Sequence, residues 1–258
     1  MNNNNFNNNK FLPWFAGFCD AESNFQTTKI KRINKNGKIT SIGLKYSFHI
    51  GLHERDRLLL EFIQSKLGDI GKIYEYPKKK ESHLAIFKKE DLKWLIENIF
   101  ANYSLLTRGQ LIRYEQLKIG ILNNLNRLDS LDDFNKILVT SENIKSNINN
   151  LSSFYIDHWI IGFLNGEVSF TNSINKNKKV PIIYLEHTDE TVIKLIKERF
   201  NISTNIFSRS RDTRKTTYIL TIGSKRDLNT IVTFLDEMNS LIGYKLTQYK
   251  EWKKNFNL

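Results

Sequence analysis

The sequence has few of the features that mark secreted, zinc-binding or membrane-spanning proteins. Its single cysteine, Cys19, excludes an internal disulfide, and no Cys-x-x-Cys pattern indicates a zinc site. No run approaches the roughly 18 consecutive apolar residues of a spanning helix, so we expect no membrane partner. The opening MNNNNFNNNK lacks the apolar centre of a signal peptide and the Arg-rich pattern of a transit peptide. It is expected to be a disordered tail.

Acidic residues are also scarce relative to basic ones. The chain of 258 residues has 27 Asp and Glu against 39 Lys and Arg, which gives a formal net charge of +12. Such an excess favours a polyanionic partner, and nucleic acid is the first candidate. The hydrophobic content of 40% is enough to bury one sizeable core or two smaller ones.

Two stretches of the sequence are nearly identical in plan. FAGFCDAESNF (15–25) and IIGFLNGEVSF (160–170) each place an acidic residue directly before a strand-like run. The order of later features also recurs about 136 to 145 residues further on, as KKEDLKWLIENI (88–99) and SKRDLNTIVTFL (224–235) show. The pattern predicts a duplicated chain whose halves fold alike and pack about a pseudo-twofold axis.

Each half has the pattern of a helix, two strands, a helix, two strands and a helix, which predicts an α+β fold of two αββαββα half-domains. The strand expected over 42–52 alternates cleanly between an apolar and a polar face. The strand expected over 24–33 does not, because Lys29 and Lys31 fall on its apolar face, so a bulge is expected there. The predicted divisions are a tail (1–10), a first repeat (11–122), a linker (123–150) and a second repeat (151–258).

Both repeated motifs combine small residues with a terminal carboxylate. Small residues four apart form a stripe that lets two helices pack at close range: Gly17 with Ala21, and Gly162 with Gly166. Helices that face each other through these stripes would bring Glu22 and Glu167 to neighbouring positions. A helix C-terminus disfavours an anion by about 0.3 to 1 kcal/mol, and two carboxylates repel each other further. An acid that ends an apolar helix is, taken alone, usually just a solvated terminus, but the pairing of two such acids predicts a hard cation such as Mg²⁺.

The motifs FAGFCDAES and IIGFLNGEV resemble those of single-chain, two-repeat LAGLIDADG homing endonucleases of organellar group I introns. FHIGLHERD, GKIYEY and NSLIGYKLTQYKEW are similar to later segments of the family, so the resemblance covers nearly the whole chain. It implies a monomer whose two antiparallel sheets form a saddle over double-stranded DNA. It also implies that Glu22 and Glu167 bind Mg²⁺ or another divalent cation, whereas Asp20 and Asn165 occupy an acidic position not used for metal.

The same resemblance implies one further catalytic residue. Lys245 matches the family's basic residue near the scissile phosphates, where a cation stabilises negative charge. Its counterpart in the first half stays open, because the register of the two repeats slips by one residue. Arg108 is the nearest cation there, while Gly109 and Gln110 stand at the aligned positions.

Residues that read the DNA sequence are expected on the polar faces of the sheets, because a β-ribbon in the major groove needs donors, acceptors and cations. For each of them the plain alternative is an exposed strand position without a contact. The loop RSRDTRK (209–215) is expected to contact phosphates. The predicted DNA-binding residues are Gln26, Thr28, Arg32, Lys45, Ser47, His49, Lys72, Tyr74 and Tyr76 in the first half and Ser169, Thr171, Ser173, Arg209 and Arg211 in the second.

Three functions remain open from the sequence. The first is a site-specific endonuclease that makes a double-strand break in a long DNA target. The second is an RNA maturase that assists splicing of its own intron, with or without DNA cleavage. The third, a DNA-binding regulator without catalysis, is disfavoured because both motif acids are present. The family resemblance and an Asn-, Lys- and Ile-rich composition, typical of an AT-rich gene, predict a mitochondrial protein encoded in the organelle.

Overall fold

The computed structural model describes residues 7–140, 142, 144, 150–176 and 178–256. Residues 1–6 of the predicted tail lie outside the described residues. Helix α1 (Asn8–Glu22) begins within the predicted tail, so the tail expected over 1–10 is too long. The reason is local: the backbone amide of Lys10 donates to both the side-chain and the main-chain oxygen of Asn7, which thereby caps the helix.

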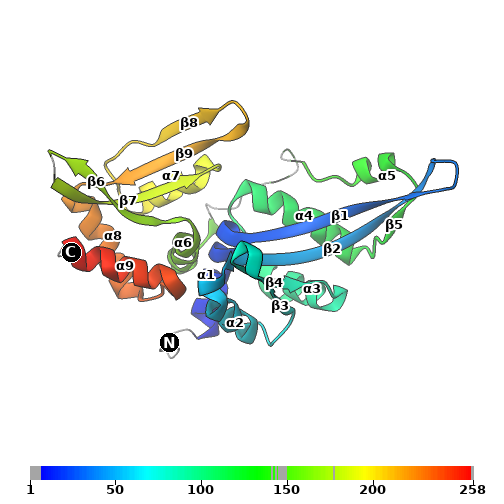
Figure 1. The fold of residues 1–258 in the computed structure, drawn as a ribbon, viewed down its shortest axis with the longest axis horizontal. Helices are drawn as coiled ribbons and strands as arrows, with labels where there is room; N and C mark the ends of the chain where they lie inside the picture. The colour runs from blue at the N-terminus through cyan, green and yellow to red at the C-terminus, as the bar shows by residue number, and fades with distance from the viewer. Residues whose placement is uncertain (1–6, 141, 143, 145–149, 177, 257–258) are drawn as a thin grey trace. The chain divides into compact units, whose positions relative to one another are not determined.

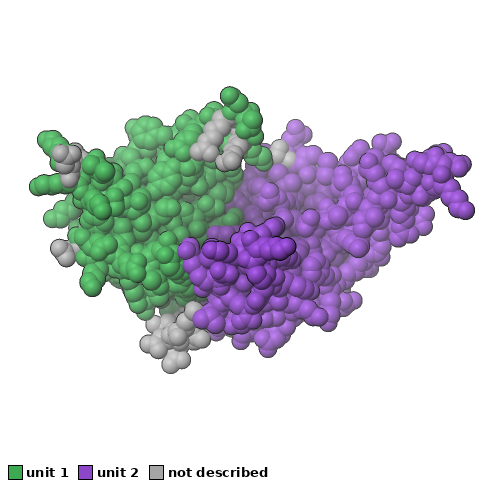
Figure 2. Space-filling view, viewed as in Figure 1, with its two compact units in different colours: residues 1–21, 151–258 green, residues 22–150 purple. Residues whose placement is uncertain are grey.

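The chain forms two compact units (Figure 2). Unit 1 contains residues 1–21 and 151–258, and unit 2 contains residues 22–150. Helix α1 therefore packs with the second repeat, although the sequence assigns it to the first. Within unit 1 its partner is the second motif helix, α6 (Ser153–Glu167).

Unit 2 is built on an antiparallel sheet whose strands follow the order β1-β2-β4-β3, with short β5 beside the outer end of β2 (Figure 1). The rings of Phe25 and Phe48 point to one face of this sheet, where Phe25 meets Phe100 and Tyr114 at centroid distances of 5.2 and 5.5 Å and Phe48 meets Phe100 at 6.5 Å. The apolar alternation of the strands thus buries one face under helices and leaves the other open. The elements are β1 (Ser23–Ile33), β2 (Ile39–His53), α2 (Arg57–Lys66), β3 (Lys72–Tyr76), β4 (Glu81–Ile86), α3 (Lys89–Leu95), α4 (Arg108–Leu122), β5 (Arg127–Leu128) and α5 (Leu131–Lys136).

The outer half of the β1–β2 hairpin corrects one expectation from the sequence. The pairing is continuous from Ser23 to Arg32 and shifts only at Ile33, so the bulge predicted around Lys29 and Lys31 is absent from this stretch. Lys29 remains on the apolar side because its ammonium lies 4.4 Å from the ring centroid of Phe134, on α5 of the predicted linker. At this end of the hairpin, the Phe134 ring of the linker therefore covers the apolar face of the sheet.

Unit 1 repeats the plan with a second antiparallel sheet, in the order β6-β7-β9-β8. Phe170 on its covered face packs against Tyr249 and Trp252 of α9, at centroid distances of 5.2 and 5.4 Å. Each repeat ends in two helices where the sequence indicated one: α3 and α4 in the first, α8 and α9 in the second (Figure 1). The elements are β6 (Ser169–Asn175), β7 (Lys178–His187), α7 (Glu190–Arg199), β8 (Phe207–Arg211), β9 (Arg214–Ile222), α8 (Lys225–Met238) and α9 (Gly243–Phe256).

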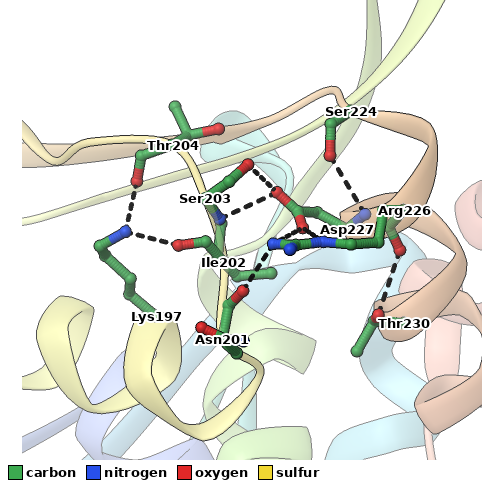
Figure 3. Close-up of polar contacts among 9 residues, drawn as sticks. All are labelled: Lys197, Asn201, Ile202, Ser203, Thr204, Ser224, Arg226, Asp227 and Thr230. Atoms are coloured by element: carbon green, nitrogen blue, oxygen red, sulfur yellow. Dashed lines mark hydrogen bonds and ion pairs between the residues drawn. The ribbon is translucent and has the colours of Figure 1, made fainter.

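A buried carboxylate fixes the start of α8 in unit 1 (Figure 3). Asp227 accepts hydrogen bonds from the backbone amide of Ser203 at 3.0 Å and from its hydroxyl at 2.6 Å, and Arg226 pairs with the same carboxylate at 2.7 Å. Ser224 caps the helix by accepting from the Asp227 amide. Burial alone would raise the pKa of Asp227, but these hydrogen bonds outweigh it and hold the pKa well below its usual range.

No helix in the described part of the chain is long and apolar enough to cross a membrane.

Candidate active site and nucleic-acid interface

The motif helices α1 and α6 contact each other backbone to backbone inside unit 1. A Cβ atom added to Gly17 would overlap the carbonyl oxygen of Trp159, and one added to Gly162 would overlap that of Trp14. The contact is thus reciprocal: each glycine lies against the backbone carbonyl of a tryptophan on the other helix. This is the close approach that the small-residue stripes predict, because only glycine leaves room for a neighbouring carbonyl there.

The earlier acidic positions of the two motifs have structural partners. Asp20 is 2% exposed, and its Oδ2 accepts a hydrogen bond from the indole nitrogen of Trp159 at 2.9 Å. Asn165 is also buried, and its Oδ1 accepts from the backbone amide of Ile242 at 2.8 Å, just before α9. In both positions the side chain supplies an acceptor oxygen, which Asp and Asn have in common.

The motif glutamates lie at the helix ends and are partly exposed. Glu22 is the last residue of α1, and Glu167 is the last residue of α6. Lys245 lies beside the second of these ends, where its Nζ donates to the carbonyl oxygen of Val168 at 2.6 Å. The structure therefore places the predicted basic residue next to a motif acid in unit 1. In unit 2 the comparable donor is the side-chain amide of Gln110, whose Nε2 donates to the carbonyl oxygen of Ser23 at 2.5 Å.

All predicted readout residues of the first repeat share one face of the unit 2 sheet. The register pairs Gln26 with Ser47 and Thr28 with Lys45. His49 and Lys72 both pair with Ala85 of β4, from its two sides, so they lie on the same face. Because side chains alternate along each strand, the remaining members fall on this same open face. We call it the unit 2 polar face: Gln26, Thr28, Arg32, Lys45, Ser47, His49, Lys72, Tyr74 and Tyr76.

The centre of the unit 2 polar face is hollowed. A cavity of about 540 Å³ is lined by residues of β1 and β2, among them Lys45, together with Phe87 and Lys89. The Nε2 atom of His49 lies 2.8 Å from the hydroxyl of Ser47. Burial, and then the nearby His83, lower the pKa of His49, so its imidazole is neutral at pH 7 and offers both a donor and an acceptor.

Two residues of this face, His83 and Phe87, were missed from the sequence. His83 pairs with Tyr74 across β3 and β4, and its Nε2 lies 3.0 Å from a carboxylate oxygen of Glu81. Phe87, which follows β4, is 54% exposed and packs edge-on to His49 at 5.2 Å. The alternation of SHLAIF would have indicated His83, but the exposed position of Phe87 depends on where β4 ends.

The open face of the unit 1 sheet is built differently. Ser169, Thr171 and Ser173 lie on it as predicted, but their neighbours on β7 are Tyr184, Ile182 and Val180. Arg209 belongs to the same face through its pairing with Thr217. Arg211 ends β8, and its side chain lies outside the described part of the structure.

A carboxylate that the sequence did not single out organises this second face. Glu186 accepts hydrogen bonds from Tyr184 and Thr217, both at 2.5 Å, and Arg209 lies 3.3 Å from it. Burial and the bond to Glu186 raise the pKa of Tyr184, which keeps its hydroxyl a donor. Arg209 is thus held in place by Glu186, a long-range pairing that no local sequence pattern indicates.

The profile of LAGLIDADG endonucleases matches residues 15–121 and 160–256. The chain belongs to the LAGLIDADG endonuclease family. This LAGLIDADG chain shares its fold with the meganuclease I-CpaMI, solved bound to uncleaved DNA, at a TM-score of 0.75, 23% identity, and coverage of 98% of this chain and 91% of that one.

The curated relatives of this LAGLIDADG chain are longer proteins than the chain itself. It is 27% identical to probable intron-encoded endonuclease Cox1-I1b of Schizosaccharomyces pombe, over 96% of this chain and 65% of that protein. It is 30% identical to the uncharacterized mitochondrial protein RF1 of Saccharomyces cerevisiae, over 68% of this chain and 36% of that protein. The chain therefore spans about a third to two thirds of the length of these relatives.

Proposed function

We propose that the chain is a site-specific homing endonuclease that makes a double-strand break by metal-dependent hydrolysis of one phosphodiester on each DNA strand. The observation that carries the proposal is the pair of partly exposed glutamates, Glu22 and Glu167, each ending a motif helix of a LAGLIDADG chain. Fungal relatives named as intron-encoded endonucleases and a fold shared with a DNA-bound meganuclease support it.

We infer that double-stranded DNA lies against the open faces of both sheets. The unit 2 polar face offers cations, amides and hydroxyls, and the unit 1 face offers hydroxyls and Arg209. These groups suit phosphate contacts and base edges in the major groove. A net charge of +12 supports a partner that carries a dense negative charge.

The motif acids fit a divalent cation that DNA helps to bind. Within the described residues, no group of three or more His, Cys, Asp or Glu side chains could hold a metal alone. Mg²⁺ is commonly bound by one or two carboxylates together with water and substrate phosphates, so Glu22 and Glu167 would supply the protein's share. When bound there, such an ion would supply Lewis-acid chemistry, polarising the phosphate and lowering the pKa of a bound water. Lys245 would stabilise negative charge on the reacting phosphate.

The proposal is tested with charge-neutralising variants. Glu22→Gln and Glu167→Gln should each abolish double-strand cleavage of the joined-exon sequence that flanks the gene, while gel-shift affinity stays within about threefold. Stability should hold or rise slightly, because an anion at a helix C-terminus is unfavourable by about 0.3 to 1 kcal/mol. Asp20→Asn is the matched control, since an amide oxygen can still accept from Trp159, as Asn165 shows at the equivalent position.

Full cleavage by either glutamine variant would refute the metal assignment.

A second function, an RNA maturase for the chain's own intron, is favoured by the intron-encoded relative. Tight binding of the unmodified protein to intron RNA, without DNA cleavage in Mg²⁺, would establish that function instead. We further propose a monomer that acts in the mitochondrion, as the name of the relative RF1 supports. Fractionation of the host cell and sedimentation of the purified protein test these two points.

A further inference from the structure

The linker between the two repeats adds a strand, β5, to the unit 2 sheet. It pairs with the outer half of β2, where Leu128 lies opposite Ile42 and Arg127 lies opposite Gly43. Ile42 is fully buried on the covered face, so Leu128 lies on that face too. Arg127 is one residue earlier and therefore lies on the open face, where it is exposed. The unit 2 polar face thus extends onto the linker.

A second arginine reaches the same point from the opposite side. Arg32 of β1 belongs to the unit 2 polar face, and a Cβ atom added to Gly43 would lie 3.9 Å from its Nε atom. Gly43 itself has no side chain, so Arg32 and Arg127 flank an open position of β2. Both arginines are exposed, and neither pairs with a carboxylate within the described residues. Both charges are therefore available to an external anion.

Contacts with β2 hold the start of the linker strand in place. The backbone amide of Leu44 donates to the carbonyl oxygen of Asn126 at 2.9 Å, and the hydroxyl of Tyr46 donates to that of Leu125 at 2.7 Å. Burial raises the pKa of Tyr46 to about 12, so this hydroxyl keeps its proton at neutral pH. Lys89 donates to the side-chain oxygen of Asn126. The residues directly before β5 are thus fixed to the sheet.

The linker is also attached to unit 2 beyond β5. Gln116 of α4 donates to the carbonyl oxygen of Ile137 at 3.3 Å and accepts from the backbone amide of Val139 at 2.8 Å. Between these contacts and β5, the ring of Phe134 is 4% exposed and packs against Lys29 of β1. Because the linker is anchored on both sides of β5, the arginine on this strand has a fixed position relative to the sheet.

The place of β5 in the sheet indicates which part of DNA it meets. The major groove is about 12 Å wide and admits a two-stranded ribbon, and neighbouring strands lie about 4.8 Å apart. β1 and β2 form such a ribbon, and β5 lies on the other side of β2 from β1. A third strand therefore falls at the wall of the groove, which consists of backbone phosphates. In the described part of unit 1, residues 178–182 of β7 pair only with β6, so that arm has no such strand.

We propose that Arg127 is a further DNA-binding residue, which the linker strand holds against a backbone phosphate at the wall of the groove that β1 and β2 enter. A guanidinium suits this role because its planar fork can donate to two phosphate oxygens at once. The inference rests on the proposed function and concerns only the half of the target that unit 2 binds. Phosphate contacts position the duplex and carry no sequence information, so Arg127 should set affinity and not base preference.

The salt dependence of binding to the joined-exon duplex tests this contact without any cleavage. Arg127→Gln should make the slope of log affinity against log salt shallower by about 0.9, so its loss of affinity should shrink about 3.5-fold between 50 and 200 mM salt. Arg127→Lys keeps the charge and should restore the slope. Arg113→Gln is the matched control, because Arg113 is an exposed arginine on α4, which packs on the covered face of the sheet.

Neutral methylphosphonate linkages, introduced one at a time into the duplex, locate the phosphate. The unmodified chain should lose affinity at each phosphate that it contacts. Arg127→Gln should become insensitive to the substitution at one phosphate in the unit 2 half and stay sensitive at the others, a result that a merely structural role would not produce. Replacing base pairs in that half should change the affinity of this variant and of the unmodified chain by equal factors.

An unchanged salt slope in Arg127→Gln, or an equal change in Arg113→Gln, would overturn the inference. So would a loss that depends on which base pair is replaced, because Arg127 would then read a base. In each of these cases the unmodified chain still binds and cuts the duplex, and the proposed function stands. An unmodified chain that does not bind the joined-exon duplex would refute the proposed function, and the inference with it.

Discussion

Replacing Gly17 with alanine should force apart the two motif helices of unit 1. The new Cβ would lie 2.8 Å from the carbonyl carbon of Trp159 and 3.0 Å from the amide nitrogen of Phe163, where carbon contacts normally need about 3.5 to 4.0 Å. The obstacle is backbone, so no side-chain rotation relieves it. Trp14 and Phe18 stack 5.0 Å apart on α1 and are at most 1% exposed, so a shift of the helix also loosens their packing.

Overpacking a close-packed core costs about 1 to 3 kcal/mol, and a backbone obstacle belongs at or above the upper end. We therefore expect Gly17→Ala to lower the free energy of unfolding by about 2 to 4 kcal/mol and the melting temperature by about 5 to 15 °C. Gly109→Ala is the control, because a Cβ there meets nothing within 4 Å and alanine favours a helix by about 0.5 to 1 kcal/mol. Differential scanning calorimetry of both variants decides the matter. Equal melting temperatures would show that the helices do not meet through Gly17.

Two further predictions follow from charge. DNA affinity should fall by about 10³ to 10⁵ between 50 and 200 mM salt, as six to ten phosphate contacts require; a dependence typical of one or two contacts would exclude binding along both sheets. Asp227, whose pKa is lowered on folding, should stabilise the protein fully above its unfolded pKa near 3.9, and this stabilisation should fade as pH falls below that value. Acid unfolding of Asp227→Asn should lack this component, and an unchanged acid transition would contradict the assignment.

The polar face of unit 2 was predictable because a strand has a strict period of two. Leu44, Tyr46, Phe48 and Ile50 fix the buried face of β2, and hydrogen-bonded pairing then carries the same alternation to β1, β4 and β3. The bulge predicted around Lys29 and Lys31 is absent, because Lys29 stays on the apolar face by packing on an aromatic ring. There the covering group is Phe134, more than a hundred residues away in sequence.

Pairings between distant segments account for what the sequence did not predict in the candidate site. Glu186 gains its role from Thr217 and Arg209, which belong to other strands. Gln110 could not be chosen over Arg108, because the one-residue slip hides which residue faces Ser23. Local patterns identify helices and faces, whereas these assignments depend on which side chains three-dimensional packing brings together.

The two sheet faces offer unlike chemistry, and this bears on the DNA target. The unit 2 polar face presents Lys45 and Lys72, and the hollow at its centre is lined by Lys45, Lys89 and a neutral His49. The unit 1 face instead surrounds its hydroxyls with apolar side chains of β7 and restrains its arginine through Glu186. Apolar groups suit thymine methyl groups, whereas lysines suit guanine acceptors. One base sequence cannot satisfy both faces equally well. We therefore expect the DNA target of the proposed endonuclease to have two unlike halves.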